Sequence, residues 1–132
     1  MKKLHLAVGI LTLIAFILTG QYLRRVYPNM VGVDDGMRML LRSRHLYIML
    51  AGALNTALGL YLIRQARGWR IIVQRLGSVL LLAAPVWLIV AFFTEPQRSL
   101  LETRFAHLGL YSIFGGIMLH LFSGAWPKRE AA

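Results

Sequence analysis

Four histidines are the side chains of this chain best suited to chemistry at membrane depth. His5, His45, His107 and His120 each fall near one end of a long apolar stretch. An imidazole is costly to keep inside lipid, so it is a candidate functional group there, and its nitrogens commonly bind metals, haem iron included. Histidine is also common at headgroup level, where the half-wet ring needs no ligand. The depth and facing of each ring therefore decide its role.

The elements that carry these histidines are predicted to be membrane-spanning helices. Of the 132 residues 58% are hydrophobic and only 15% are charged, which is too apolar for a soluble domain. The apolar residues form four blocks, each about long enough to cross ~30 Å of hydrocarbon. We expect one integral membrane domain over residues 1–132, an all-α protein with four transmembrane helices in an up-down-up-down bundle. The predicted spans cover about residues 4–22, 45–63, 72–93 and 105–123.

The connections between the spans hold most of the charge. The net charge is +10, and the basic residues cluster in short connections, where they set topology and attract anionic lipid headgroups. No soluble surface is left to present a basic patch, which argues against nucleic acid as a partner. The basic segment MRMLLRSR before the second span predicts a short, separate interfacial helix. The basic residues on the two sides nearly balance, but the tight turn with Arg64, Arg67 and Arg70 favours a cytoplasmic N-terminus.

The missing residue types exclude several classes of site. The chain has no cysteine, so it has no thiolate metal site and no c-type haem attachment. No carboxylate is predicted inside a span, and small proton-coupled exporters generally need one there. The five acids are expected in loops or the tail: Asp34, Asp35, Glu95, Glu102 and Glu130.

In the predicted bundle the four histidines fall into two pairs at matching depth. His5 opens the first span and His120 nearly closes the fourth, so both lie at one side of the bilayer. His45 and His107 lie at the other side. An iron in the plane of a haem accepts one axial nitrogen from each face, and helical bundles supply such ligands from facing helices. The pattern therefore predicts one or two b-type haems, with all four histidines as axial ligands.

The neighbours of each histidine along its helix face bear on this prediction. Small residues share the faces of His5, His45 and His120, which would let a porphyrin lie near the backbone, although such residues more often serve helix packing. His107 shares its face with bulkier residues. It also lies 13 positions from His120, which separates the two rings by about 140° around a straight helix. That spacing counts against a second site at His107.

The same segments resemble the bacterial cytochrome b561 family of four-helix membrane cytochromes. LHLAVGILTLIAFILTG is similar to the first span of that family, RSRHLYIMLAG to the start of its second, and AHLGLYSIFGGIMLHLF to a fourth span with two histidines. The resemblance implies two b-type haems, held by His5 with His120 and by His45 with His107. It also implies a bacterial inner membrane protein that transfers electrons between a quinol or quinone and another acceptor. Arginines at the two surfaces, such as Arg24, Arg44 and Arg70, would pair with haem propionates.

Three alternatives stay open from the sequence. The chain could be a non-catalytic accessory subunit that packs against a larger membrane complex, or a small dimeric channel or exporter. The four methionines around His45 could instead indicate copper. These methionines are Met30, Met37, Met39 and Met49. Whether the chain acts alone, as a homodimer or within a larger complex is not encoded in any of these patterns.

Overall fold

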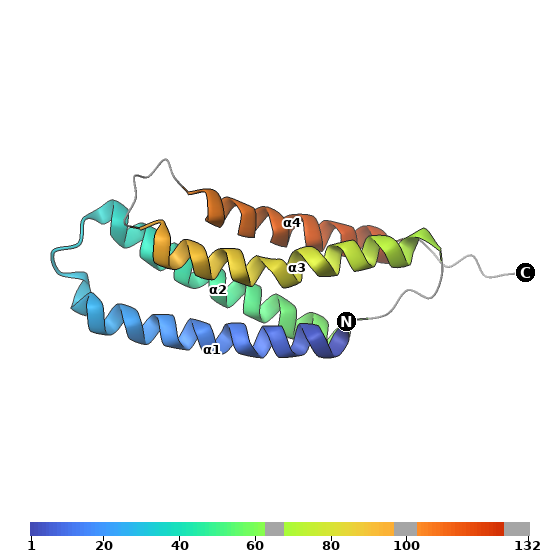
Figure 1. Ribbon diagram of the computed structural model, residues 1–132, viewed down its shortest axis with the longest axis horizontal. Helices are drawn as coiled ribbons and strands as arrows, with labels where there is room; N and C mark the ends of the chain where they lie inside the picture. Colours follow the sequence, from blue (N-terminus) through green and yellow to red (C-terminus); the bar gives the residue numbers. More distant parts are fainter. Residues whose placement is uncertain (63–67, 97–102, 126–132) are drawn as a thin grey trace, which may run out of the picture.

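Four long helices make up the computed structural model, which describes residues 1–62, 68–96 and 103–125. They are α1 (Lys2–Val26), α2 (Asp35–Tyr61), α3 (Trp69–Thr94) and α4 (Arg104–Ala125), with a short 3-10 turn, η1 (Pro28–Met30), after α1. Successive helices run antiparallel, so the N-terminus and the end of α4 lie at the same end of the bundle (Figure 1). No strand occurs among these residues, and the predicted all-α class is confirmed.

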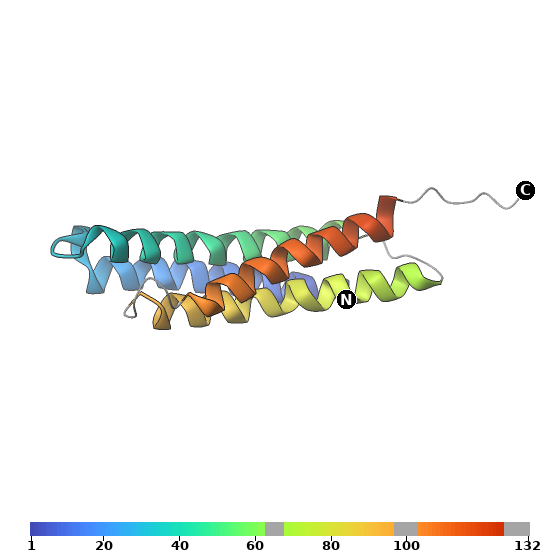
Figure 2. The ribbon, with the colours of Figure 1, turned by 90° about the horizontal axis from the view of Figure 1, so that it is seen from above.

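The bundle consists of two tightly packed helix pairs, α1 with α2 and α3 with α4, joined mainly through α2 and α3 (Figures 1 and 2). Glycines allow the close approach within each pair. A Cβ atom at Gly59 would meet backbone atoms of Leu6, and one at Gly116 would come within 2.9 Å of the Gly77 carbonyl oxygen. Small residues are the usual means by which helices approach each other in lipid, where no hydrophobic effect drives them together.

Three of the helices, α1, α3 and α4, are long and apolar enough to cross a membrane. Large apolar side chains on the helix surfaces are exposed, for example Leu11, Leu18 and Phe114, as expected of a protein whose surroundings are lipid. The fourth helix, α2, is less apolar because it carries Arg44, Asn55 and several glycines. Arg44, Gly52, Asn55 and Gly59 are buried against the neighbouring helices, whereas Asp35 and Arg42, which also lower the hydropathy of α2, are exposed.

Helix α2 begins earlier than the sequence predicted. The Asp34 side chain accepts hydrogen bonds from the backbone N–H groups of Gly36 and Met37, which caps a helix that starts at Asp35 and continues without interruption to Tyr61. The prediction of a separate interfacial helix in MRMLLRSR is therefore wrong. An N-cap aspartate is a sequence signal for a helix start, and here it outweighs the change in hydropathy at His45. Ile63, the predicted end of this span, lies outside the described residues.

The other helix ends lie close to their predicted positions. Helix α1 extends a few residues beyond the predicted 4–22, and α3 and α4 bracket the predicted 72–93 and 105–123. Pro85 lies within α3, whose helical assignment runs through it, and it is buried. Because every helix is continuous, the depth of each histidine follows directly from its position along its helix.

Candidate histidine centre

Two of the four histidines meet inside the bundle at the end that holds the N-terminus. His5 of α1 is fully buried, and its ring centroid lies 6.4 Å from that of His120 on α4, with the ring planes at 72°. With metal–nitrogen bonds of about 2 Å, two imidazoles on opposite sides of one iron have ring centroids roughly 6 Å apart. The separation between His5 and His120 is of this size.

Asn55 of α2 fixes which nitrogen of His5 carries a proton. Its amide nitrogen donates to the carbonyl oxygens of Ala51 at 3.0 Å and Leu81 at 2.8 Å. This sets the orientation of the amide, so the Asn55 oxygen, 2.7 Å from Nδ1 of His5, can only accept. Nδ1 of His5 must therefore be the protonated donor.

The second nitrogen of the His5 ring, Nε2, therefore carries no proton. Nε2 carries the lone pair, is buried and has no hydrogen-bond partner in the structure. A buried polar atom without a partner costs roughly 1–3 kcal/mol, so such an atom calls for an explanation. A histidine that donates through one nitrogen and presents a lone pair on the other has the form found in metal-ligating imidazoles.

His120 supplies the second ring and borders an open space. Its Nε2 lies 3.2 Å from the Ser78 hydroxyl, which can rotate to pair with either ring tautomer. A Cβ atom at Gly77 would come within 3.0 Å of the His120 ring, so this glycine leaves room for the imidazole against α3. A groove of about 380 Å³ between α2 and α4 reaches His120, within the range of ~300–1,000 Å³ typical of small-molecule sites. Its other walls are apolar: Leu54, Ala57, Leu58, Tyr61, Leu81, Ile117 and Leu121.

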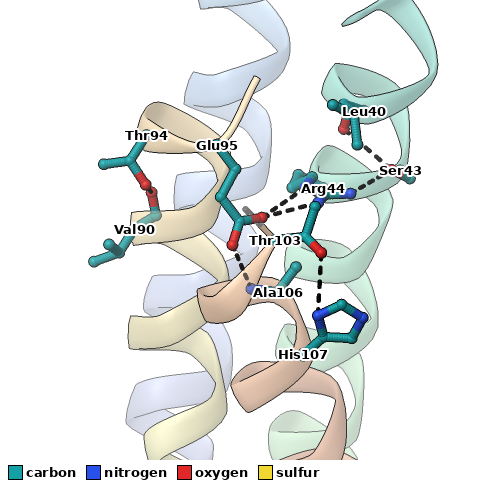
Figure 3. Close-up of polar contacts among 9 residues, drawn as sticks. All are labelled: Leu40, Ser43, Arg44, Val90, Thr94, Glu95, Thr103, Ala106 and His107. Carbon is teal, nitrogen blue, oxygen red and sulfur yellow. Dashed lines mark hydrogen bonds and ion pairs between the residues drawn. The ribbon is translucent and has the colours of Figure 1, made fainter. Parts of the chain in front are cut away.

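The other predicted pair is not brought together. His45 of α2 contacts α1 and α3: its ring stacks on Phe16 with centroids 4.2 Å apart, and its Nδ1 lies 3.0 Å from the Thr19 hydroxyl. His107 of α4 is exposed, and its contacts are with Thr103 and Tyr111 of its own segment (Figure 3). No ring contact joins the two imidazoles, both of which the structure describes. The donor set for a second haem does not fit here.

Neighbouring helices fill the space beside the small residues, where the sequence suggested that a porphyrin could lie. Gly9 lies directly against the backbone of Thr56, and a Cβ atom at Gly52 would come within 3.0 Å of the Leu13 side chain. On α4, Gly109 lies against Leu88. These glycines serve helix packing, and not the binding of a porphyrin, which was the other function considered for them.

At the opposite end a buried ion pair connects three helices (Figure 3). Glu95, which follows α3 and is 1% exposed, accepts hydrogen bonds from Nε and Nη2 of Arg44 at 3.0 and 2.9 Å. Its other oxygen accepts the backbone N–H of Ala106 at 2.9 Å, in the first turn of α4. A carboxylate at a helix N-terminus satisfies a free N–H group and interacts favourably with the helix dipole.

This ion pair changes two expectations. Glu95 lies outside α3, directly after its last residue, as expected of a loop residue, but its side chain is buried, which was not expected. Arg44 was a candidate partner for a haem propionate, but its guanidinium is already paired with Glu95. At the other end, Arg70 donates through Nε to the Ser123 carbonyl oxygen at 2.9 Å. Arg24 remains exposed at the surface of α1.

Sequence reasoning missed the residues that support the histidines. Asn55 joins α2 to α3 through the Leu81 carbonyl oxygen and to α1 through His5, and the contact with His5 was not foreseen. Ser78 and Thr19 were not singled out as partners of His120 and His45. One signal was present: a lone asparagine in an apolar helix needs a polar partner, and His5 lies at the matching depth of the neighbouring helix.

No group of three or more histidine, aspartate or glutamate side chains suited to a metal ion occurs in residues 1–62, 68–96 and 103–125. The methionines near His45 do not converge, because Met30 and Met37 pack against the core while Met39 and Met49 are exposed. The chain has no match among protein-family models, curated proteins or solved structures.

Proposed function

We propose that this chain is a b-type cytochrome of a bacterial inner membrane that binds one haem between His5 and His120. The observation that carries the proposal is the buried, unpartnered Nε2 of His5, which keeps its lone pair because Asn55 accepts the Nδ1 proton, in a ring whose centroid lies 6.4 Å from that of His120. The resemblance to the bacterial cytochrome b561 family led us to the same pair. The proposal is limited to one haem because His45 and His107 share no contact.

The proposed membrane arrangement has all four helices crossing, with the N-terminus in the cytoplasm. The antiparallel course of the helices supports a crossing by α2 between α1 and α3 (Figure 1). The orientation follows from the basic residues in the sequence between α2 and α3, Arg64 and Arg67, and from Arg70 at the start of α3. The histidine pair then lies toward the cytoplasmic side.

In this proposal the residues of the chain hold and tune the cofactor. His5 and His120 would hold the haem iron through their ring nitrogens. Asn55 keeps the proton on Nδ1 of His5 and holds the ring at a fixed angle, and such supporting contacts tune ligand basicity. The apolar walls of the groove exclude water. When bound, the haem supplies one-electron chemistry, with a quinol or quinone as the proposed exchange partner.

The visible spectrum of the detergent-purified protein, expressed with excess haem, tests the proposal. We expect a sharp α-band on reduction with dithionite that is lost in His5→Ala and His120→Ala and kept in His45→Ala and His107→Ala. Free imidazole added to His120→Gly should restore part of the band. Helical circular dichroism and elution volume of each variant control for misfolding.

A colourless wild-type protein, or a band that survives loss of both His5 and His120, would overturn the proposal. The first result would favour the accessory-subunit function. A band that falls only in part in His107→Ala and in His45→Ala would favour the second haem that the sequence predicted.

A further inference from the structure

A second imidazole with an available lone pair lies at the other level of the bundle, on the surface of the α1–α2 pair. The Thr19 hydroxyl donates its one proton to the Phe16 carbonyl oxygen at 2.9 Å. Because this proton is already used, the Thr19 oxygen can only accept a hydrogen bond from Nδ1 of His45, which lies 3.0 Å away. Nδ1 of His45 therefore carries the ring proton. Nε2 of His45 is left as a hydrogen-bond acceptor, and no described residue donates to it.

This acceptor opens into a groove of about 440 Å³. Gly20 provides the opening, since a Cβ atom there would lie 3.2 Å from Cε1 and 3.4 Å from Nε2 of His45. Phe16 covers one face of the ring. The remaining wall is mixed, with apolar Ile17 and Leu23 beside the polar ends of Gln21 and Arg24.

The groove continues an exposed stripe along α1. Residues spaced three and four apart share a helix face, and this one runs from apolar to polar toward the end of the helix. Ile10, Ile14 and Ile17 are 47%, 47% and 57% exposed, and Gln21 and Arg24 follow them, also exposed. The stripe therefore presents hydrocarbon first and hydrogen-bond donors last, in the order of a phospholipid chain and its headgroup.

The depth of the groove agrees with this order. The 25 residues of α1 extend about 37 Å at ~1.5 Å per residue, several ångströms more than the ~30 Å hydrocarbon core. Gln21 and Arg24 lie in the last two turns of α1, at the level of the headgroups. A neutral acceptor at this boundary is matched by a donor, and a guanidinium is matched by an anion.

We propose that this groove binds a phospholipid whose headgroup carries a primary ammonium, of the phosphatidylethanolamine type. The phosphate accepts from Arg24 at the polar end of the stripe, the ammonium turns back by one helical turn to donate to Nε2 of His45 at the level of Gly20, and an acyl chain lies along Ile17, Ile14 and Ile10. A trimethylated headgroup has the same net charge but no N–H group, so it cannot satisfy His45. This inference is independent of haem binding.

A methylation series of lipids tests the donor requirement. Dioleoyl phosphatidylethanolamine, its N-methyl and N,N-dimethyl derivatives and dioleoyl phosphatidylcholine are titrated into delipidated protein, and bound lipid is counted by native mass spectrometry. The first three lipids retain at least one N–H, and we expect them to bind comparably. Phosphatidylcholine should bind about tenfold more weakly, because it lacks this charge-assisted hydrogen bond.

Variants locate the site. His45→Phe keeps an aromatic ring on Phe16 but removes the acceptor, and it should abolish the preference over phosphatidylcholine. Arg24→Gln should weaken binding of all four lipids. His107→Phe, the same change at an exposed histidine outside the groove, is the matched control and should retain the preference. Equal binding of phosphatidylethanolamine and phosphatidylcholine by the wild type would overturn the proposal, as would an equal loss of the preference in His107→Phe. Tighter binding of dioleoyl phosphatidylglycerol, titrated in the same way, would also overturn it.

Discussion

Asn55 determines the chemical state of His5 and is the single residue on which the histidine centre depends most. Replacing it by leucine, which has a similar volume but no polar atoms, removes the acceptor of the Nδ1 proton and two donations to backbone carbonyls. We expect Asn55→Leu to release the fixed tautomer of His5 and to lower the free energy of unfolding by about 1–3 kcal/mol. Ring ¹⁵N chemical shifts of labelled, haem-free protein report the tautomer directly.

The control for this prediction is Thr56→Val. Thr56 is the next residue of α2, and its hydroxyl bonds only to the Gly52 carbonyl oxygen of the same helix. Its loss should leave the His5 tautomer unchanged. A wild-type spectrum with the proton on Nε2 of His5 would contradict the arrangement, whether or not haem is bound.

At the scale of single residues, the sequence placed the histidines by depth but not by direction. It predicted that His5 and His120 lie at one level, and their rings meet there. The 13-residue spacing already indicated that His107 points away from the side on which His120 lies, and His107 is exposed. The contact of His5 with Asn55, 50 positions apart, depends on how α1 and α2 rotate against each other. That rotation is set by glycine contacts, which the sequence does not specify.

At the scale of elements, the Arg44–Glu95 pair joins α2 to the end of α3 and the start of α4. Removing one partner of a buried pair leaves an uncompensated charge and typically costs about 3–5 kcal/mol. We expect losses of this size for Arg44→Met and for Glu95→Leu, and a much smaller loss for the double variant. Thermal unfolding in detergent, followed by circular dichroism, measures all three. Additive losses would show that the two side chains are not coupled.

Adjacent glycines of α4 give a matched test of helix packing. A Cβ atom at Gly116 would come within 2.9 Å of the Gly77 carbonyl oxygen and would also meet Leu81, whereas one at Gly115 would make an ordinary contact 3.5 Å from Leu80. Gly116→Ala should force α3 and α4 apart and cost about 1–3 kcal/mol. Gly115→Ala should be neutral or stabilising by up to ~1 kcal/mol, because alanine favours the helix. Equal effects of the two changes would contradict the packing described.

At the scale of the whole molecule, hydropathy predicted the four helices, three of which are long and apolar enough to cross a membrane. It failed at the end of the bundle opposite the N-terminus, where polar groups are satisfied internally. The basic start of α2 resembled a separate interfacial segment, and hydropathy did not predict that the side chain of Glu95 would be buried. Ion pairing and capping between helices allow both to be part of the bundle, and such long-range pairs leave no periodic pattern in the sequence.

The crossing of α2 is the last prediction, and the chain is well suited to test it because it lacks cysteine. Single cysteines at Val31, which is 81% exposed between α1 and α2, and at Trp69, which is 56% exposed at the start of α3, report the two ends of α2. If α2 crosses and the N-terminus is cytoplasmic, a membrane-impermeant maleimide labels Val31→Cys in spheroplasts and Trp69→Cys only in inverted vesicles. The reverse pattern would retain the crossing and invert the orientation. Labelling of both positions from one side would show that α2 does not span, because three crossings alone would leave these two residues on the same face of the membrane.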